Sequence, residues 1–310
     1  MKEKREFDFD FPENYHSSQS LNKDLESLCE KNSDLLTRHH LGKSTEGKEI
    51  WCYIISSKQS ALETIPASLI IGCHHGRECI TSEAAYYGMK YLLENHSANE
   101  KIHVWIEHSA IIFVPMLNPD GHDVINRKNG NEVDLNRNYT FNWGIAPGCS
   151  HDPTSEIYCG PNQLSEIESQ LVNKMKIIDE LFLKYKNIKC SLDMHSGATL
   201  LLYPWGYSWD PTPDNAVFET LCQQMEQQAR EMQVEPFPSG PGISLYPTSG
   251  TYIDHVYQFY HCISYVLELY KGRWAGSIWE FFNPPSEQVE PVCHRVLPVI
   301  FTLIDYATKI

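Results

Sequence analysis

The sequence lacks the features of a membrane-inserted or exported chain. It contains no uninterrupted apolar run of about 18 residues, so we expect no transmembrane helix. Residues 1–6 are mostly charged, and no apolar segment of the kind found in secretory signals follows them. We therefore expect a cytoplasmic protein that has no membrane partner, with residues 1–14 forming a charged, poorly ordered lead.

The sequence also lacks a disulfide pattern and an excess of basic residues. The ten cysteines show neither C-x-x-C spacing nor the arrangement of a small disulfide scaffold, which predicts mostly buried, reduced thiols. Basic residues are outnumbered, since 25 Lys and Arg face 40 Asp and Glu and the formal net charge is −15. This charge argues against nonspecific binding to nucleic acid, although individual arginines could still form a local positive pocket.

The length and the pattern of apolar residues predict the fold class. A chain of 310 residues with 42% hydrophobic residues can bury a sizeable core. We predict helices over about 81–95, 215–232 and 287–308, a strand that ends at Glu268, and a mobile loop over 235–250. Strands and helices alternate, which indicates one α/β domain over residues 15–310, with a mixed, mostly parallel sheet.

A candidate metal motif follows the apolar run 69–73. His75 and Glu78 stand three residues apart just after this predicted strand, so both side chains can point at one ion. An imidazole nitrogen and a carboxylate oxygen suit zinc, and a catalytic zinc takes three protein ligands and leaves one position open. His195, at the end of another apolar run, is the best candidate for the third ligand. His74 has the wrong spacing for a ligand.

Two further features are unusual for structural residues. Glu268 lies inside an otherwise apolar strand, where a carboxylate is costly to bury unless it has a partner or a task. Asn136 and Arg137 lie in a loop-rich region over 117–162, and a loop of this length is usually functional.

In combination, these features resemble the zinc carboxypeptidases of the carboxypeptidase A type, the M14 peptidase family. The resemblance extends from about residue 15 to the C-terminus, in the family's order and at close to its spacing. Its motifs are Gly72-Cys73-His74-His75-Gly76-Arg77-Glu78, Leu117-Asn118-Pro119-Asp120-Gly121, Arg127-Lys128, Asp134-Leu135-Asn136-Arg137-Asn138, Leu192-Asp193-Met194-His195-Ser196, Leu202-Tyr203-Pro204-Trp205-Gly206-Tyr207, Tyr246 and Glu268. The family's fold is a twisted sheet with helices on both faces. Cys149 and Cys159 lie near the position of a disulfide in some members, and the sequence leaves their pairing open.

The resemblance implies a zinc site and a catalytic pair. One Zn²⁺ per chain would bind His75, Glu78 and His195. Glu268 would act as the general base, and Arg127 would stabilise the oxyanion. Asp134 and Asp193 are expected to have structural or supporting roles.

The resemblance also implies how a peptide with a free C-terminal carboxylate would bind. Asn136 and Arg137 would hold that carboxylate, because a guanidinium group fits a carboxylate with two parallel hydrogen bonds. Tyr246 would swing over the substrate, and Arg77 would be an outer contact along the cleft. Ile253 falls where the family sets side-chain preference, so an apolar or neutral residue is expected there.

Several alternatives to an ordinary carboxypeptidase are open at this point. A murein-peptide or γ-glutamyl peptidase would also bind a terminal carboxylate. An N-acyl amino acid deacylase shares the zinc scheme, but the presence of both Tyr246 and Glu268 disfavours it. A noncatalytic zinc- or peptide-binding protein would be indicated by the loss of Glu268 or of a ligand, and neither is lost.

Overall fold

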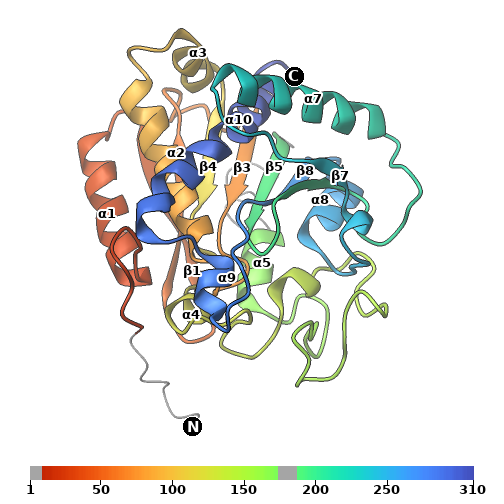
Figure 1. The fold of residues 1–310 in the computed structure, drawn as a ribbon. Coiled ribbons are helices and arrows are strands. Elements are labelled where there is room, and N and C mark those ends of the chain that lie inside the picture. The colour runs from red at the N-terminus through yellow and green to blue at the C-terminus, as the bar shows by residue number, and fades with distance from the viewer. Residues whose placement is uncertain (1–8, 174–186) are drawn as a thin grey trace.

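The computed structural model describes residues 9–173 and 187–310, and an eight-stranded mixed sheet forms its centre (Figure 1). The strands lie in the order β1-β2-β4-β3-β5-β8-β6-β7. Four of the seven pairings are parallel, which confirms the predicted α/β class with a mixed, mostly parallel sheet. The strands are β1 (Leu36–Lys43), β2 (Glu49–Ile55), β3 (Ala67–Ile71), β4 (Ala110–Val114), β5 (Ile188–His195), β6 (Leu200–Tyr203), β7 (Ser239–Pro241) and β8 (Ile263–Glu268).

Helices cover both faces of this sheet. Strand residues alternate between two apolar clusters, since Ile70 belongs to one cluster and its neighbours Leu69 and Ile71 belong to the other. The first cluster is covered by α1 (Ser18–Lys31), α2 (Ile80–Asn95), α3 (Glu100–His108), α7 (Asn215–Glu231) and α10 (Val289–Thr308). The second lies mainly under α5 (Ile167–Asn173) and α8 (Tyr252–Tyr260). Because both faces are covered, central strands such as β3 and β4 are buried along their whole length.

Short elements complete the chain near the ends of the strands. They are α4 (Pro119–Asp123), α9 (Ile278–Phe282), and the single-turn helices η1 (Leu135–Arg137), η2 (Gly242–Ser244) and η3 (Ser286–Gln288). The predicted helices over 81–95 and 215–232 match α2 and α7 closely. The loop predicted over 235–250 is wrong in part, because β7 pairs with β6 at the edge of the sheet.

The segment that leads into α1 packs on α9. The rings of Phe9 and Phe11 both contact Trp279, and the Tyr15 hydroxyl donates to the carbonyl oxygen of Pro284 at 2.6 Å. Residues 1–8 lie outside the described residues. The poorly ordered lead therefore stays a prediction for that part of residues 1–14. Over the described ranges, no helix combines the length and hydropathy that a membrane crossing needs.

His255 on α8 links the fold to pH. This side chain is 3% exposed, and neither ring nitrogen has a hydrogen-bond partner among the described residues. Burial lowers the pKa of His255 from its ordinary 6.5 to about 4. Between these two pKa values, His255 binds a proton in the unfolded chain but stays neutral in the folded chain. The free energy of unfolding therefore falls as pH falls through this window.

We predict that His255→Leu removes much of this acid sensitivity. A shift of this size corresponds to roughly 3 kcal/mol between pH 6.5 and pH 4. Urea unfolding of both proteins at several pH values in that window measures the difference. His108→Leu, at an exposed histidine near the end of α3, is the control and should keep the wild-type slope. Equal slopes for all three proteins would contradict the prediction.

Candidate active site

Three neighbouring strands bring the predicted site residues to one edge of the sheet. His75 follows β3, His195 is the last residue of β5, and Glu268 is the last residue of β8. Strand β5 pairs in parallel with both β3 and β8, and His195 stands directly opposite Glu268. The carboxyl ends of parallel strands meet at one edge, where α/β proteins usually bind ligands.

A close contact with α4 and with the loop that follows it fixes the backbone around His75. At Gly76, a Cβ atom would lie 2.0 Å from the carbonyl carbon of Gly121, so a larger residue cannot fit there. The amide of Gly76 donates to the carbonyl oxygen of Arg127, and the amide of Arg77 donates to that of Asn126. The loop that carries Arg127 is thereby held against the loop that carries His75.

The predicted zinc ligands converge at hydrogen-bond distance. Glu78 Oε1 lies 2.9 Å from His75 Nδ1, Glu78 Oε2 lies 2.9 Å from His195 Nδ1, and the two Nδ1 atoms are 3.1 Å apart. Ligand atoms about 2.0–2.1 Å from a shared tetrahedral zinc lie roughly 3.3 Å from one another. The three side chains, all buried, therefore fit a zinc ion with little movement.

The opposite ring nitrogens of both histidines contact buried carboxylates. His75 Nε2 lies 3.0 Å from Asp134 Oδ1, and His195 Nε2 lies 2.9 Å from Asp193 Oδ2. Such contacts fix the tautomer of a metal-binding histidine and leave its Nδ1 lone pair for the metal. Both aspartates thus lie where supporting residues are needed.

The carboxylates of the site have opposite pKa shifts. Burial alone would raise the pKa of Glu78, but His75 and His195 outweigh it and hold that pKa below its ordinary value. Glu78 is therefore ionised, as a metal ligand requires. Burial raises the pKa of Glu268 to about 7, and the charge of Glu78 adds to this effect. A carboxylate with a pKa near 7 can both accept and return a proton at neutral pH.

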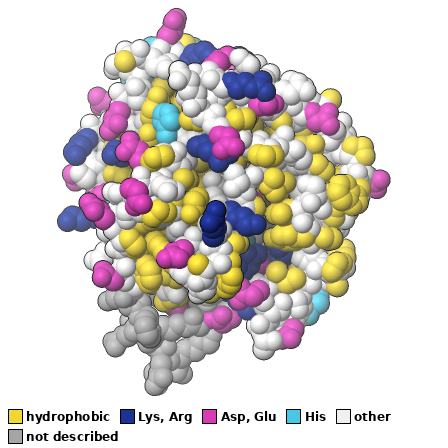
Figure 2. Space-filling view, in the orientation of Figure 1, with side chains coloured by type: hydrophobic (Ala, Val, Ile, Leu, Met, Phe, Trp, Pro, Cys, Tyr) yellow, Lys and Arg dark blue, Asp and Glu magenta, His cyan; other side chains and the backbone are white. Residues whose placement is uncertain are grey.

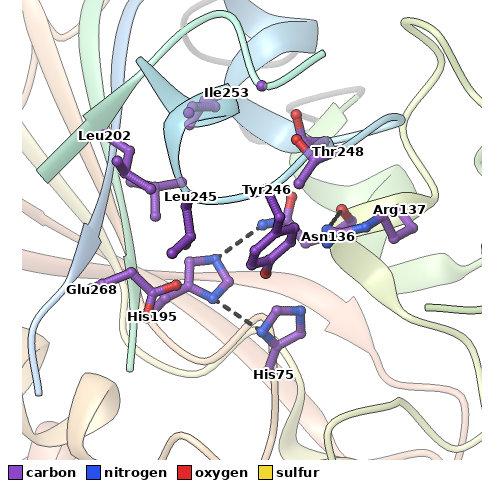
Figure 3. Close-up of a pocket in the computed structure, with 14 residues that line it drawn as sticks. His75, Asn136, Arg137, His195, Leu202, Leu245, Tyr246, Thr248, Ile253 and Glu268 are labelled. Atoms are coloured by element: carbon purple, nitrogen blue, oxygen red, sulfur yellow. Dashed lines mark hydrogen bonds between the residues drawn. The ribbon is translucent and has the colours of Figure 1, made fainter. Parts of the chain in front are cut away.

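A pocket of about 50 Å³ lies beside the metal ligands (Figure 3). Seven predicted site residues line it: His75, Asn136, Arg137, His195, Tyr246, Ile253 and Glu268. Sequence reasoning assigned no role to the other lining residues, which are Leu202, Gly206, Gly242, Leu245, Thr248, Thr251 and Val266. The signal that could have found several of them is their position in the chain, because Leu245 and Thr248 flank Tyr246.

Arg137 is suited to bind an anion in this pocket. It is 2% exposed, its Nη1 donates to the carbonyl oxygen of Asn136 at 2.7 Å, and its Nε has no partner among the described residues. A buried guanidinium with an unsatisfied N–H group can donate to a ligand carboxylate. The Asn136 side chain is held from both ends, because its Oδ1 accepts from the amide of Tyr252 and its Nδ2 lies 3.3 Å from Asp193 Oδ2.

The other two predicted arginines occupy different places. Arg127 donates to Asp134 Oδ2 through Nε and Nη2, and its Nη1 lies 3.3 Å from His75 Nδ1. Arg77 lies outside the set of pocket-lining residues, with its guanidinium 4.4 Å from the ring centre of Phe282 and 2.9 Å from a carboxylate oxygen of Glu156. Despite the formal net charge of −15, one face carries basic side chains near its centre among apolar ones (Figure 2).

The cysteines lie outside the catalytic constellation. All ten are free thiols, and Cys149 and Cys159 are among them. The cytoplasmic location stays a prediction.

Comparisons with known proteins agree with this geometry. Residues 21–298 match the family described as zinc carboxypeptidase. Carboxypeptidase A1 of Rattus norvegicus is 26% identical over 95% of this chain and 70% of its own length. Carboxypeptidase B of Helicoverpa zea is 27% identical over 91% of this chain and 68% of its own length. The crystal structure of carboxypeptidase A from Helicoverpa armigera superposes with a TM-score of 0.81 at 26% identity, covering 95% of this chain and 74% of that one.

Proposed function

Because this chain belongs to the zinc carboxypeptidase family, it is a zinc-dependent hydrolase of peptide bonds, and we propose that it removes a C-terminal residue with an apolar or neutral side chain. The observation that carries the proposal is the position of Arg137. Among the described residues that line the pocket, it is the one arginine or lysine, and the metal ligands His75 and His195 line the same pocket. A terminal carboxylate paired with Arg137 would bring the last peptide bond next to His75 and His195.

The pocket wall supports the side-chain preference. Leu202, Leu245 and Ile253 face its interior (Figure 3). A charged side chain placed against them would lose its hydration without gaining a partner, which costs several kcal/mol. An aliphatic side chain would gain from the same contact, since each buried methylene contributes about 0.8 kcal/mol.

Four side chains at the site would have roles in this reaction beside the metal ligands. Zinc, when bound, supplies a Lewis acid that activates a water molecule and polarises the substrate carbonyl. Glu268 would accept the proton of that water and pass it to the leaving amine. Arg127 would place a fixed cation beside the developing oxyanion, an interaction worth about 3–4 kcal/mol in other enzymes. Tyr246, 47% exposed at the mouth of the pocket, would close over the substrate, and Arg77 would contact it further along the cleft.

A screen of peptides that differ only in their last residue tests the proposal. We predict that kcat/KM for peptides ending in leucine or valine exceeds that for peptides ending in lysine or glutamate by roughly 100-fold, which corresponds to about 2.7 kcal/mol. The variant Ile253→Asp should shift the preference toward lysine, because the new carboxylate pairs with the ammonium group. Val104→Asp, at an exposed position on α3, is the control and should keep the wild-type order.

The same screen separates this proposal from its alternatives. A γ-D-glutamyl peptide cleaved faster than every ordinary peptide would favour a murein-peptide or γ-glutamyl peptidase. Release of an acyl group from N-acyl amino acids, with no peptide cleaved, would favour a deacylase. Equal cleavage of leucine- and lysine-terminated peptides would refute the apolar preference and leave the peptidase assignment in place.

A further inference from the structure

We propose that His74 is a positioning residue of the zinc site, which holds the ligand His195 in place through Asp193. The proposal rests on the zinc site of the proposed function, but its test measures metal affinity and does not depend on the substrate. His74 precedes the ligand His75 in the chain, yet it belongs to a different group of contacts.

His74 is completely buried and has a partner at each ring nitrogen. Its Nδ1 lies 2.6 Å from Asp193 Oδ1, and its Nε2 lies 2.7 Å from the Tyr139 hydroxyl oxygen. Its ring stacks on that of His195 at an interplanar angle of 18°, with ring centres 5.9 Å apart. Since the exposed fraction of His74 is 0%, it cannot touch a substrate.

Asp193 connects this histidine to the metal ligand. Asp193 and His195 are two residues apart on β5, so their side chains project from the same face of the strand. Asp193 Oδ2 lies 2.9 Å from His195 Nε2, while Oδ1 lies beside His74. One buried carboxylate therefore bridges two imidazole rings.

The donor and the acceptor can be assigned for each hydrogen bond that links His195 through Asp193 and His74 to Tyr139. Because the Nδ1 lone pair of His195 faces the metal position, its Nε2 carries the hydrogen and donates to Asp193. An ionised aspartate only accepts, so His74 Nδ1 also donates to it. The Nε2 of a neutral His74 is then left as an acceptor for the Tyr139 hydroxyl. Asn136 Nδ2, which lies 3.0 Å from His195 Nε2, is also a donor and therefore gives its hydrogen to Asp193 Oδ2 at 3.3 Å. Asp193 thus accepts from three donors, and these contacts hold the ring of His195 in the orientation that zinc requires.

The other ligand histidine has a matching arrangement. His75 Nε2 contacts Asp134 Oδ1, and Arg127 donates twice to Asp134 Oδ2. His74 thus donates to Asp193 as Arg127 donates to Asp134, and each of these aspartates contacts a ligand histidine. The two differ in position, because the Nη1 of Arg127 reaches within 3.3 Å of a ligand atom, whereas the ring nitrogens of His74 contact Asp193 and Tyr139, and its ring meets His195 only by stacking.

A second metal ion is the competing explanation for this cluster. His74, Asp193 and His195 are close enough to hold an ion of their own. That arrangement would require His195 to lose the hydrogen of Nε2 while its Nδ1 binds the first zinc. The 2.6 Å between His74 Nδ1 and Asp193 Oδ1 is a hydrogen-bond distance and is clearly shorter than the roughly 3.3 Å that separates two ligand atoms of one zinc. Measuring the number of zinc ions per chain separates the two explanations.

Two amide substitutions of His74 test the positioning role. Asn can place its N–H group near the position of Nδ1, whereas Gln extends toward the position of Nε2 and leaves Asp193 without this donor. In chelator competition with the whole chain, we expect His74→Gln to raise the zinc Kd roughly tenfold or more, in the range typical of residues that support a metal ligand. His74→Asn should stay within about threefold of wild type, because the donor to Asp193 is retained.

Two further variants complete the test. Tyr139→Phe removes the hydroxyl group that donates to His74. It should raise the zinc Kd by about threefold, a loss close to that of one weak hydrogen bond. His294→Leu replaces a half-buried histidine on α10 that contacts Tyr87 and Tyr91 instead, and it should leave the zinc Kd unchanged. Thermal unfolding of the metal-free proteins measures any general damage to the fold.

Three outcomes would overturn the proposal. Equal zinc affinity in the Gln, Asn and wild-type proteins would show that the donor to Asp193 is irrelevant to metal binding. Two zinc ions per wild-type chain, with one lost in His74→Asn, would assign His74 as a ligand instead. If neither amide variant folds, an unchanged zinc Kd in Tyr139→Phe overturns it. None of these outcomes depends on whether the protein cleaves peptides.

Discussion

Glu268→Gln is expected to lower kcat by roughly 10³-fold, within the range that general acid–base catalysis contributes. Glutamine has nearly the same shape, so the pocket and the metal ligands should stay intact. Glu268 Oε2 accepts from the amide of Ala198 at 3.2 Å, and the amide oxygen of glutamine can accept the same hydrogen bond. What is lost is the ability to take up a proton, so kcat should fall while KM changes little.

Zinc content and peptide affinity are the controls for this variant. Glu280→Gln, at an exposed position in α9, should behave as wild type in all three measurements. Wild-type turnover by zinc-loaded Glu268→Gln would show that another group takes the proton. Loss of zinc from the variant would instead place Glu268 in the metal site.

The dependence of kcat/KM on pH gives a second test of Glu268 as the proton acceptor. Burial, supported by the charge of Glu78, raises the pKa of Glu268 to about 7. A divalent cation beside Glu78 would lower that pKa, because it offsets the carboxylate charge. Only the ionised form accepts a proton, so wild-type kcat/KM should rise with pH and level off at or below about pH 7. The residual activity of Glu268→Gln should lack this acidic limb.

Much of the metal site could be predicted from the sequence because its signals are local. His75 and Glu78 are three residues apart after an apolar strand, and this spacing alone places them near each other. His195 and Glu268 end two other apolar runs, and parallel strands bring such ends to one edge of a sheet. The family motifs then ordered these pieces along the chain.

The supporting contacts could not be predicted in the same way because they join distant parts of the chain. His74 and Asp193 are 119 positions apart, and His74 and Tyr139 are 65 apart. No periodicity links residues at such separations. The spacing of His74 argues against a role as a ligand, but spacing gives no information about what a side chain contacts across the core.

Helix α8 shows a second limit. Its apolar positions 252, 253, 256, 257 and 260 recur at helical spacing, but the helix is only nine residues long, and the polar residues Asp254 and His255 are buried beside them. Asp254 accepts from the amide of Gly206, and this contact between segments 48 positions apart helps to shape the pocket. The sequence placed Ile253 in the pocket through the family resemblance, but it gave no size or depth to that pocket.

Arg137→Ala should lower kcat/KM by roughly 100-fold on peptides with a free C-terminal carboxylate. A charge-assisted hydrogen bond contributes about 1.5–3 kcal/mol, and each 1.4 kcal/mol is a factor of ten. The Arg137 guanidinium is buried in the pocket with Nε unpaired among the described residues, so removing it leaves a substrate carboxylate without its partner. Arg230→Ala, at an exposed arginine on α7, is the matched control and should have no effect.

Amidating the substrate distinguishes a direct contact from a general disturbance of the pocket. If Arg137 pairs with the terminal carboxylate, amidation should reduce kcat/KM of the wild type by a similar factor of roughly 100, because the same interaction is lost. Amidation should then do little further damage in Arg137→Ala, since the contact is already absent. The two changes would be strongly nonadditive, which is the mark of two groups that interact directly. If the wild type cleaves amidated and free-acid peptides equally well, the site does not recognise a terminal carboxylate. An enzyme with this zinc site would then be a peptidase of another specificity, and Arg137 would have a structural role.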